Sequence, residues 1–318
     1  MKEIGGYLEL EQFVSNEYYP NLIALNTARN ALVYLLNARK VQKVYLPHFL
    51  CDSVSKVCQR EGYAYEYYAV KRDFTPDFDK ALAAGEYLYI VNFYGQLSNE
   101  MIAEYQKQYH SIIVDNVQAF FQHPVEGVDT LYSCRKFFGV PDGAYLSTDC
   151  ILGEPLERDV SANRLKHLLG RLECGSAADY YSDFQENDES FSTLKLMYMS
   201  KLTHYLLGAV DYEKVKKKRE ENFLFLHQAL QEYNSLTITV PQGAYAYPFY
   251  CENGAMLRNK LVEKRIYVPT LWPNVLQSTD CLAADYAENI LPLPIDQRYS
   301  YADLNEVINI ITKWKGLS

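Results

Sequence analysis

The chain has 318 residues, of which 48% are hydrophobic and 22% charged, a composition that suits a globular protein with a large core. Its formal net charge of -9 weighs against a nucleic-acid-binding protein, which needs a basic face. The basic run from Lys214 to Arg219 is balanced by Glu213, Glu220 and Glu221, so we interpret it as a solvated helix face.

The cysteine pattern indicates a reducing compartment. The 7 cysteines are scattered and odd in number, and no two of them form a C-x-x-C pair. This fits neither a disulfide framework nor a structural zinc site. No segment is apolar over the length that crosses a membrane, and the first residues lack a signal-like apolar run. We therefore expect a soluble, cytoplasmic protein without a membrane partner.

The first part of the chain alternates segments of helical and of strand periodicity, as parallel strands joined by helices do. Gly, Pro or a polar capping residue bounds most of these segments. Helices are expected at 27–39, 52–61 and 99–109, and strands at 43–46, 63–70, 86–93, 111–115, 128–133 and 143–148. The pattern predicts a mainly parallel sheet sandwiched by helices within residues 1–211.

The second part has weaker signals. Residues 150–211 show no clear period, and we interpret the polar stretch 182–192 as a loop. A long charged helix is expected at 212–233, with an apolar stripe through Phe223, Leu226 and Leu230. Strands are expected at 236–240, 245–250, 266–268 and 290–292, and helices at 255–264 and 301–313. The predicted fold class is thus α/β, with a linker helix and a smaller C-terminal α+β domain over residues 212–318.

A lysine among aromatic residues follows one of the expected strands. Lys136 precedes a Pro-Asp-Gly turn and lies in a loop at strand ends, where α/β sheets present their ligands. Such an amine could form a Schiff base with pyridoxal phosphate, although most lysines beside aromatics are surface residues. Asp115 ends a buried strand and could pair with the cofactor's pyridine nitrogen. The alternative interpretation of Asp115 is a turn-initiating aspartate.

A phosphate site is expected where the first helix begins. Thr27 can cap this helix, and the amides of Ala28 and Arg29 would face outward, where the helix dipole favours an anion. Ser133 could add a hydroxyl, while a capped helix without a ligand is the alternative. The chain contains no G-x-G-x-x-G, no P-loop and no G-x-S-x-G motif, and its histidines show no metal spacing. Dinucleotide, P-loop, serine-hydrolase and metal sites therefore lack support.

The chain resembles a known family over several short segments, mainly in its first half. These segments are Gly5-Gly6-Tyr7, Asn26 to Leu32, Tyr45-Leu46-Pro47, Asn92 to Gln96, Val114 to Ala119 and Ser133 to Gly143, with a weaker piece at Leu291 to Pro294. In them the chain is similar to the DegT-type (DegT/StrS) sugar aminotransferases, which are pyridoxal phosphate enzymes of the aspartate aminotransferase superfamily, fold type I.

The resemblance implies a role for individual residues. Lys136 would form the Schiff base, Asp115 would pair with the pyridine nitrogen, and Gln118 would lie near the ring hydroxyl. Ser133, Thr27 and the amides of Ala28 and Arg29 would hold the phosphate. It also implies a homodimer that takes an amino group from glutamate or a similar donor and passes it to a keto group, on a nucleotide-linked sugar.

The chain departs from the family at three places. Its serine and lysine lie two residues closer together, and the lysine is followed by Pro-Asp-Gly-Ala instead of a Gly-Glu-Gly-Gly-like turn. The aromatic that covers the ring falls on Cys51, which leaves His48 or Phe49 to stack. The family's Asn-x-Arg interface segment has only Asn187 as a candidate.

Three functions follow from these observations. The first is a pyridoxal-phosphate-dependent aminotransferase. The second is another reaction of the same cofactor, such as elimination or aldol cleavage. The third is a catalytically weak relative that binds the cofactor or a sugar nucleotide. Turnover of glutamate to 2-oxoglutarate separates the first function from the third.

Overall fold

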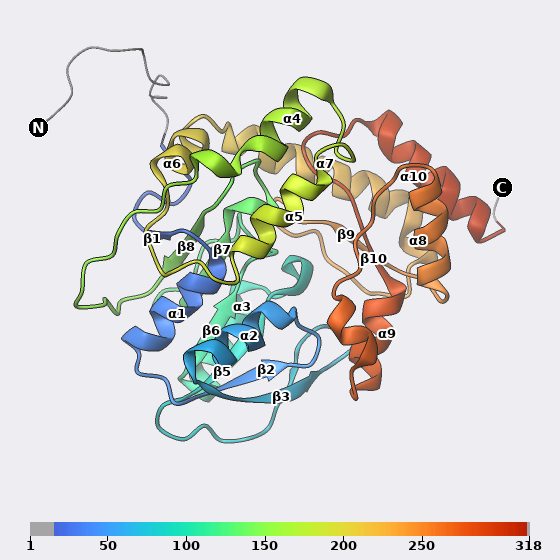
Figure 1. The fold of residues 1–318 in the computed structure, drawn as a ribbon. Helices are drawn as coiled ribbons and strands as arrows, with labels where there is room; N and C mark the ends of the chain where they lie inside the picture. Colours follow the sequence, from blue (N-terminus) through green and yellow to red (C-terminus); the bar gives the residue numbers. More distant parts are fainter. Residues whose placement is uncertain (1–15, 317–318) are drawn as a thin grey trace, which may run out of the picture.

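In the computed structural model, which describes residues 16–316, an eight-stranded sheet occupies the larger part of the molecule (Figure 1). The strand order is β1-β8-β7-β6-β5-β2-β3-β4, and the central strands β7, β6, β5, β2 and β3 pair in parallel. The predicted mainly parallel sheet is therefore confirmed, whereas Gly5-Gly6-Tyr7 lies outside the described residues. The strands are β1 Ile23–Leu25, β2 Lys43–Pro47, β3 Ala64–Val70, β4 Pro76–Asp77, β5 Glu86–Val91, β6 Ile112–Asp115, β7 Asp129–Ser133 and β8 Ala144–Ser147.

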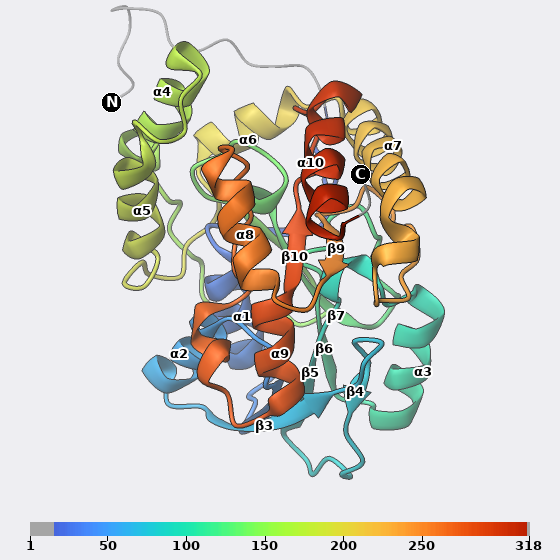
Figure 2. The same ribbon diagram turned by 90° about the vertical axis from the view of Figure 1, so that its right-hand side faces the viewer.

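Helices cover both faces of the sheet. Helices α1 (Ala28–Ala38) and α2 (Asp52–Glu61) lie on one side, and α3 (Asn99–Tyr109) lies on the other (Figure 2). Thr27 caps α1, because its hydroxyl accepts a 3.0 Å hydrogen bond from the Asn30 amide. The apolar stripe of α1 is buried against the strands, so the start of the helix is held at the edge of the sheet where β7 and β8 pair.

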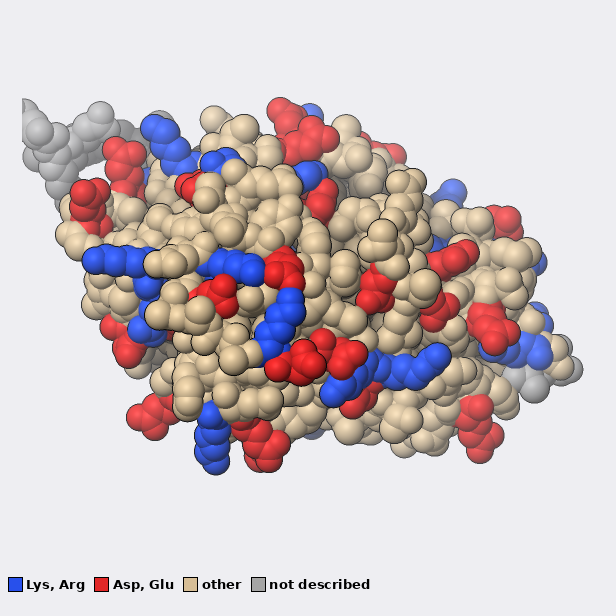
Figure 3. Space-filling model, turned by 90° about the horizontal axis from the view of Figure 1, so that it is seen from below, with Lys and Arg blue, Asp and Glu red and all other residues tan. Residues whose placement is uncertain are grey.

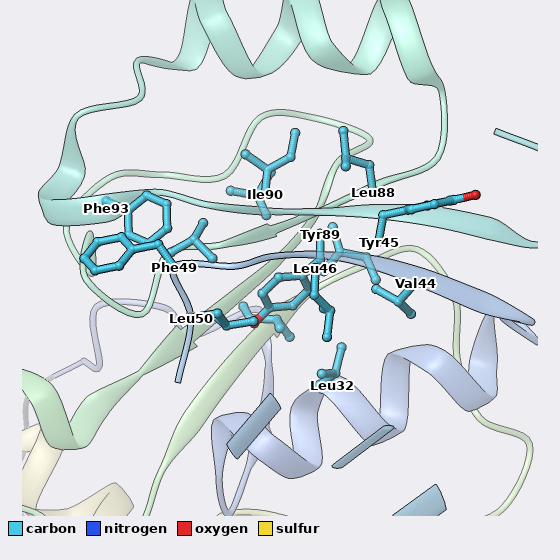
Figure 4. Packing of buried hydrophobic residues seen from close by; sticks show 14 of the residues in the cluster. Leu32, Val44, Tyr45, Leu46, Phe49, Leu50, Leu88, Tyr89, Ile90 and Phe93 are labelled. Carbon is cyan, nitrogen blue, oxygen red and sulfur yellow. The ribbon is translucent and has the colours of Figure 1, made fainter. Parts of the chain in front are cut away.

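The strand interiors are apolar on both faces, which explains the unbroken hydrophobic run of β5. In Figure 4, Leu88 and Ile90 point to one side of the sheet, while Tyr89 and Leu46 point to the side of Leu32 from α1. All five of these side chains are buried. The core thus continues through the sheet from one helix layer to the other.

The C-terminal part builds a second hydrophobic core around the antiparallel pair β9 (Tyr247–Tyr250) and β10 (Ile290–Leu293). Leu271, Trp272 and Tyr286 pack instead into the core of the large sheet. The two cores agree with a large and a small domain, and the boundary between residues 211 and 212 stays a prediction. The helices here are α7 Tyr212–Leu230, α8 Gly254–Glu263, α9 Cys281–Asn289 and α10 Tyr301–Trp314.

Along the chain, three helices that the sequence did not predict lie between β8 and α7: α4 (Lys166–Cys174), α5 (Tyr181–Ser190) and α6 (Lys201–Gly208). The interpretation of 182–192 as a loop is wrong, because α5 covers most of it. Only Asn187 of this helix is buried, so α5 has no apolar stripe to reveal it.

The strands predicted at 236–240 and 266–268 are also absent from the described structure. A strand requires a neighbouring strand for its backbone groups, and here the Thr239 amide binds the Gln96 side chain instead, at 2.8 Å. The remaining predicted helices and strands are found within a few residues of their expected bounds.

The surface carries charges of both signs. In the view from below, basic and acidic side chains alternate over the molecule without a large patch of one sign (Figure 3). None of the helices within residues 16–316 is long and apolar enough to cross a membrane.

Candidate active site

Strand pairing brings the predicted site residues to the carboxyl ends of β5, β6 and β7. Asp115 at the end of β6 is in register with Val91 on one side and Leu131 on the other. Ser133 follows Leu131 by two residues and therefore faces the same side of the sheet as Asp115. Asp115 and Ser133, which the sequence predicts as partners, thus share one face of the sheet.

Asp115 is buried at 7% exposure and accepts two hydrogen bonds. The Tyr89 hydroxyl donates to Oδ2 and the Val117 amide donates to Oδ1, both at 2.8 Å. Burial raises the pKa of Asp115, whereas the two hydrogen bonds and the Lys136 ammonium act in the opposite direction. The carboxylate is therefore poised to pair with a cation.

The sequence did not reveal Tyr89 as a residue of the site. It lies inside the buried β5 strand, and its hydroxyl reaches across to β6. The available signal was a tyrosine in an otherwise apolar strand, since a buried hydroxyl requires a hydrogen-bond partner.

Lys136 ends a 3₁₀ turn, Cys134–Lys136, that follows β7 directly. Its half-buried side chain places Nζ 5.1 Å from the centroid of the Tyr245 ring. Tyr245 belongs to the segment before β9, so the C-terminal part of the chain contributes an aromatic to the site. The positive charge of Lys136 lowers the pKa of Asp115, and this effect is smaller than those of burial and of the two hydrogen bonds.

The lysine loop is tied to the second core by Arg219 of α7. The guanidinium, 2% exposed, donates to the carbonyls of Phe137 at 3.2 Å and of Ala244 at 3.0 Å. Gln297 also donates to the Phe137 carbonyl, at 3.1 Å. Burial lowers the pKa of Arg219 to about 10, so the group stays charged at neutral pH. The residue that follows Lys136 is thus held from the small domain.

Hydrogen bonds hold the turn after the lysine at Asp142 and at Gly143. The buried Asp142 carboxylate accepts from the amide and the hydroxyl of Ser200, at 3.0 and 2.8 Å, and from the Thr203 hydroxyl. Gly143 has φ 115° and donates to the Asn26 carbonyl at 2.7 Å. A Cβ at this position would lie 2.9 Å from Thr203 Cγ2. The Pro-Asp-Gly turn therefore joins the lysine loop to the start of α1 and to α6.

At the start of α1, the Thr27 hydroxyl serves as the helix cap. The amides of Ala28 and Arg29 come before the first intrahelical hydrogen bond and have no carbonyl one turn back. The Arg29 side chain turns aside to Asp188, at 3.7 Å. A phosphate role for Thr27, Ala28, Arg29 and Ser133 stays a prediction.

Gln118 is buried in the site, and its Oε1 accepts from the Tyr94 amide at 2.8 Å. Its amide nitrogen is therefore the group that can donate to a ligand.

The stacking residue does not lie where the sequence placed it. Phe49 is 0% exposed, with its ring centroid 5.1 Å from those of Phe93 and Trp272, so it belongs to the core. His48 stacks on Tyr67, at 5.1 Å between centroids. The cause is the apolar surface of residues 271–287, which covers Phe49. The aromatic nearest the amine is Tyr245.

The residues present fit pyridoxal phosphate. A buried carboxylate and an amine lie at the ends of neighbouring strands, and these are the groups that the cofactor's nitrogen and aldehyde require. The two first amides of α1 offer donors for a phosphate. Asn187 Oδ1 is buried and has no hydrogen-bond partner within the described chain, which leaves an acceptor for a further group.

Comparison with known proteins places the fold. No protein-family model matches the sequence, and no curated protein matches it either. A DegT/DnrJ/EryC1/StrS aminotransferase from Brucella abortus has a TM-score of 0.64 at 16% identity, over 92% of this chain and 85% of its own. NtdA from Bacillus subtilis with bound PMP has a TM-score of 0.65 at 15% identity, over 92% of this chain and 72% of its own. The sugar aminotransferase CalS13 from Micromonospora echinospora has a TM-score of 0.61 at 14% identity, over 92% of this chain and 87% of its own.

At these identities the similarity establishes the architecture. The chain has the fold of these aminotransferases, over most of its own length and most of theirs. The fold class predicted from the sequence is confirmed.

Proposed function

We propose that this chain is a pyridoxal-phosphate-dependent aminotransferase that moves an amino group from glutamate, or a similar donor, to a keto group on a nucleotide-linked sugar. The observation that carries the proposal is the placement of the buried Asp115 at the end of β6 and of Lys136 in the turn directly after the neighbouring strand β7. The shared fold adds support, because NtdA was solved with bound PMP and CalS13 is a sugar aminotransferase.

When bound, pyridoxal phosphate supplies an electron sink for the negative charge that develops on the donor's α-carbon. Asp115 holds the positive charge of the pyridine nitrogen in place, and Tyr89 orients that carboxylate. Lys136 would hold the cofactor through its amine, and its Nζ is the group that would carry the α-proton of the donor. Thr27, Ser133 and the amides of Ala28 and Arg29 bind the phosphate, and the Gln118 amide nitrogen donates to the ring hydroxyl.

The assembly and location belong to the same proposal. The protein acts as a homodimer in the cytoplasm, with an amino donor and a keto-sugar acceptor as its small-molecule partners. Support for a reducing compartment comes from the cysteines, all of which are free thiols.

The test is the visible absorbance of the protein with added pyridoxal phosphate, followed by borohydride reduction and peptide mapping. Wild type is expected to show a band that glutamate bleaches, to release 2-oxoglutarate and to carry the cofactor on Lys136 after reduction. Lys136→Ala should lose the covalent attachment and at least about 10³-fold in turnover. Lys56→Ala, at an exposed position of α2, is the matched control and should behave as wild type.

Other outcomes favour the other functions. A band that glutamate does not bleach would indicate a different reaction of the cofactor or a binding protein. The absence of a band in wild type would refute the proposal, because the protein would then share the fold without binding the cofactor.

A further inference from the structure

Three guanidinium groups gather around the ring of Phe191, immediately beside the candidate active site. Arg135 lies 4.2 Å from the ring centroid, and Arg29 and Arg164 each lie at 5.9 Å. Arg135 directly precedes Lys136, and Arg29 is the second residue of α1. The arginine cluster, as we call Arg29, Arg135 and Arg164, is therefore carried in part by the lysine turn and by the start of α1, the two segments that hold the amine and the predicted phosphate site.

Carboxylates within the described structure neutralise the cluster only in part. Asp188 forms ion pairs with two of the arginines, at 3.1 Å to Arg135 and 3.7 Å to Arg29. Asp159 contacts Arg164 at 2.7 Å. The three arginine side chains are 25%, 18% and 14% exposed, so water screens them only weakly. One positive charge is left over where water is scarce.

The cluster also contains hydrogen-bonding capacity that the protein does not use. Arg164 Nε is buried and meets no acceptor among residues 16–316. Burial lowers the pKa of Arg135, and its neighbours Arg29 and Arg164 lower it further, against the effect of Asp188. A group with several oxygens and more than one negative charge would satisfy the free donor and relieve this repulsion. A phosphate matches this description better than a carboxylate does.

We propose that the arginine cluster binds a phosphate group beside Lys136. The inference rests on the proposed function, since that function brings two phosphates to this place: the one on the cofactor and the diphosphate of a nucleotide-linked acceptor. Of the three arginines, Arg135 contributes most to phosphate binding, because it lies closest to Phe191 and next to Lys136 in the chain.

The first test compares pyridoxal phosphate with pyridoxal, which has the same ring without the phosphate. Arg135→Gln is expected to weaken pyridoxal phosphate about 10- to 100-fold, the worth of one charged hydrogen bond, and to leave pyridoxal unchanged. Arg171→Gln removes the same charge from an exposed position of α4 and should change neither ligand. Pyridoxal bound at Lys136, together with release of 2-oxoglutarate from glutamate, shows that the proposed function holds, whatever happens to the phosphate preference.

A second arm identifies the source of the phosphate. Binding of thymidine diphosphate is measured by calorimetry with each variant. If Arg135→Gln weakens the nucleotide but not pyridoxal phosphate, the cluster serves the acceptor, and the reverse result assigns it to the cofactor. If neither phosphate ligand weakens, or if pyridoxal weakens equally, the proposal is overturned.

Asp188→Asn provides a test in which phosphate binding should become stronger. It tests the proposal even if Arg135→Gln does not fold. This change removes the carboxylate that competes for Arg29 and Arg135. A phosphate site should then bind its ligand severalfold more tightly. A cluster that only stabilises α5 would bind phosphate no better or more weakly in this variant, and that outcome would refute the proposal.

Discussion

The Asp115 carboxylate is buried with two neutral donors, and Lys136, the cation that lowers its pKa, is itself half-buried. An acid of this kind costs folding stability whenever it is ionised without a partner, because burial disfavours its charge. It lies at the point where the proposed function requires a negative charge. Function and stability therefore oppose each other at this residue.

Replacing the acid should show this conflict. The folded pKa of Asp115 is raised, so its contribution to stability is full below the unfolded value near 3.9 and is lost as the pH rises through the folded pKa. Without cofactor, Asp115→Asn should therefore unfold at a higher temperature than wild type at pH 7.5, and the gain should vanish near pH 4. Cofactor affinity should fall roughly 10- to 100-fold.

The neighbouring strand offers a control with the opposite expectation. Asp129 in β7 is also buried, but Arg39 holds it through two hydrogen bonds, at 2.8 and 2.9 Å. Asp129→Asn should lower the unfolding temperature at pH 7.5. If Asp115→Asn lowers it as well, burial does not dominate at Asp115.

Among the secondary-structure elements, α6 depends on the turn that follows Lys136. Its cap, Ser200, is held by Asp142, and the same turn reaches α1 through Gly143 and the Asn26 carbonyl. The turn therefore connects a helix start, a helix cap and the lysine loop. This explains why Pro-Asp-Gly stands here, where the resemblance leads one to expect Gly-Glu-Gly-Gly.

Asp142→Ala is expected to lower the free energy of unfolding by about 1–3 kcal/mol, because the Ser200 amide and two hydroxyls lose a buried acceptor. It should also slow attachment of the cofactor to Lys136, measured by stopped-flow absorbance. Asp211 caps the exposed start of α7 and is the control. Asp211→Ala should cost stability alone, so equal attachment rates in both variants would disprove the link.

At the scale of the whole molecule, the C-terminal core is linked to a further cluster of buried aromatic residues, which contains Phe137, beside the candidate active site. Arg219 of α7 bonds the carbonyls of Phe137 and Ala244, and Gln297 reaches Phe137 from the segment after β10. Lys136 contacts Tyr245 from the same side. The position of the small domain therefore determines the position of the lysine.

Arg219→Met should expose this dependence. The change removes the Arg219 donor from the Ala244 carbonyl and leaves the Phe137 carbonyl with Gln297 alone, which should cost roughly 2–4 kcal/mol in urea unfolding. It should also shift the pH dependence of the cofactor's visible band, because Lys136 loses its support. Arg298→Met removes an exposed arginine that pairs with Asp296 and should leave the band unchanged. A band with the wild-type pH profile in Arg219→Met would mean that Arg219 only stabilises the fold.

What the sequence determined by itself is local. Caps and apolar stripes predicted α1, α2 and α3, and buried runs predicted the strands that carry Asp115 and Ser133. The order of Asp115, Ser133 and Lys136 along the chain then placed all three at the same edge of the sheet. These inferences succeeded because periodicity, capping and the alternation of a strand act over a few residues.

The tertiary structure alone decided which distant side chains meet. Tyr89 reaches Asp115, Phe49 is covered by residues 271–287, and Arg219 binds the Phe137 carbonyl of the lysine loop from 82 positions away in the chain. The polar helix α5 exists because its neighbours hold it, and the arginine cluster forms only once α1, the lysine loop and Phe191 are packed together. Such contacts depend on the packing of complete elements, which no local pattern encodes.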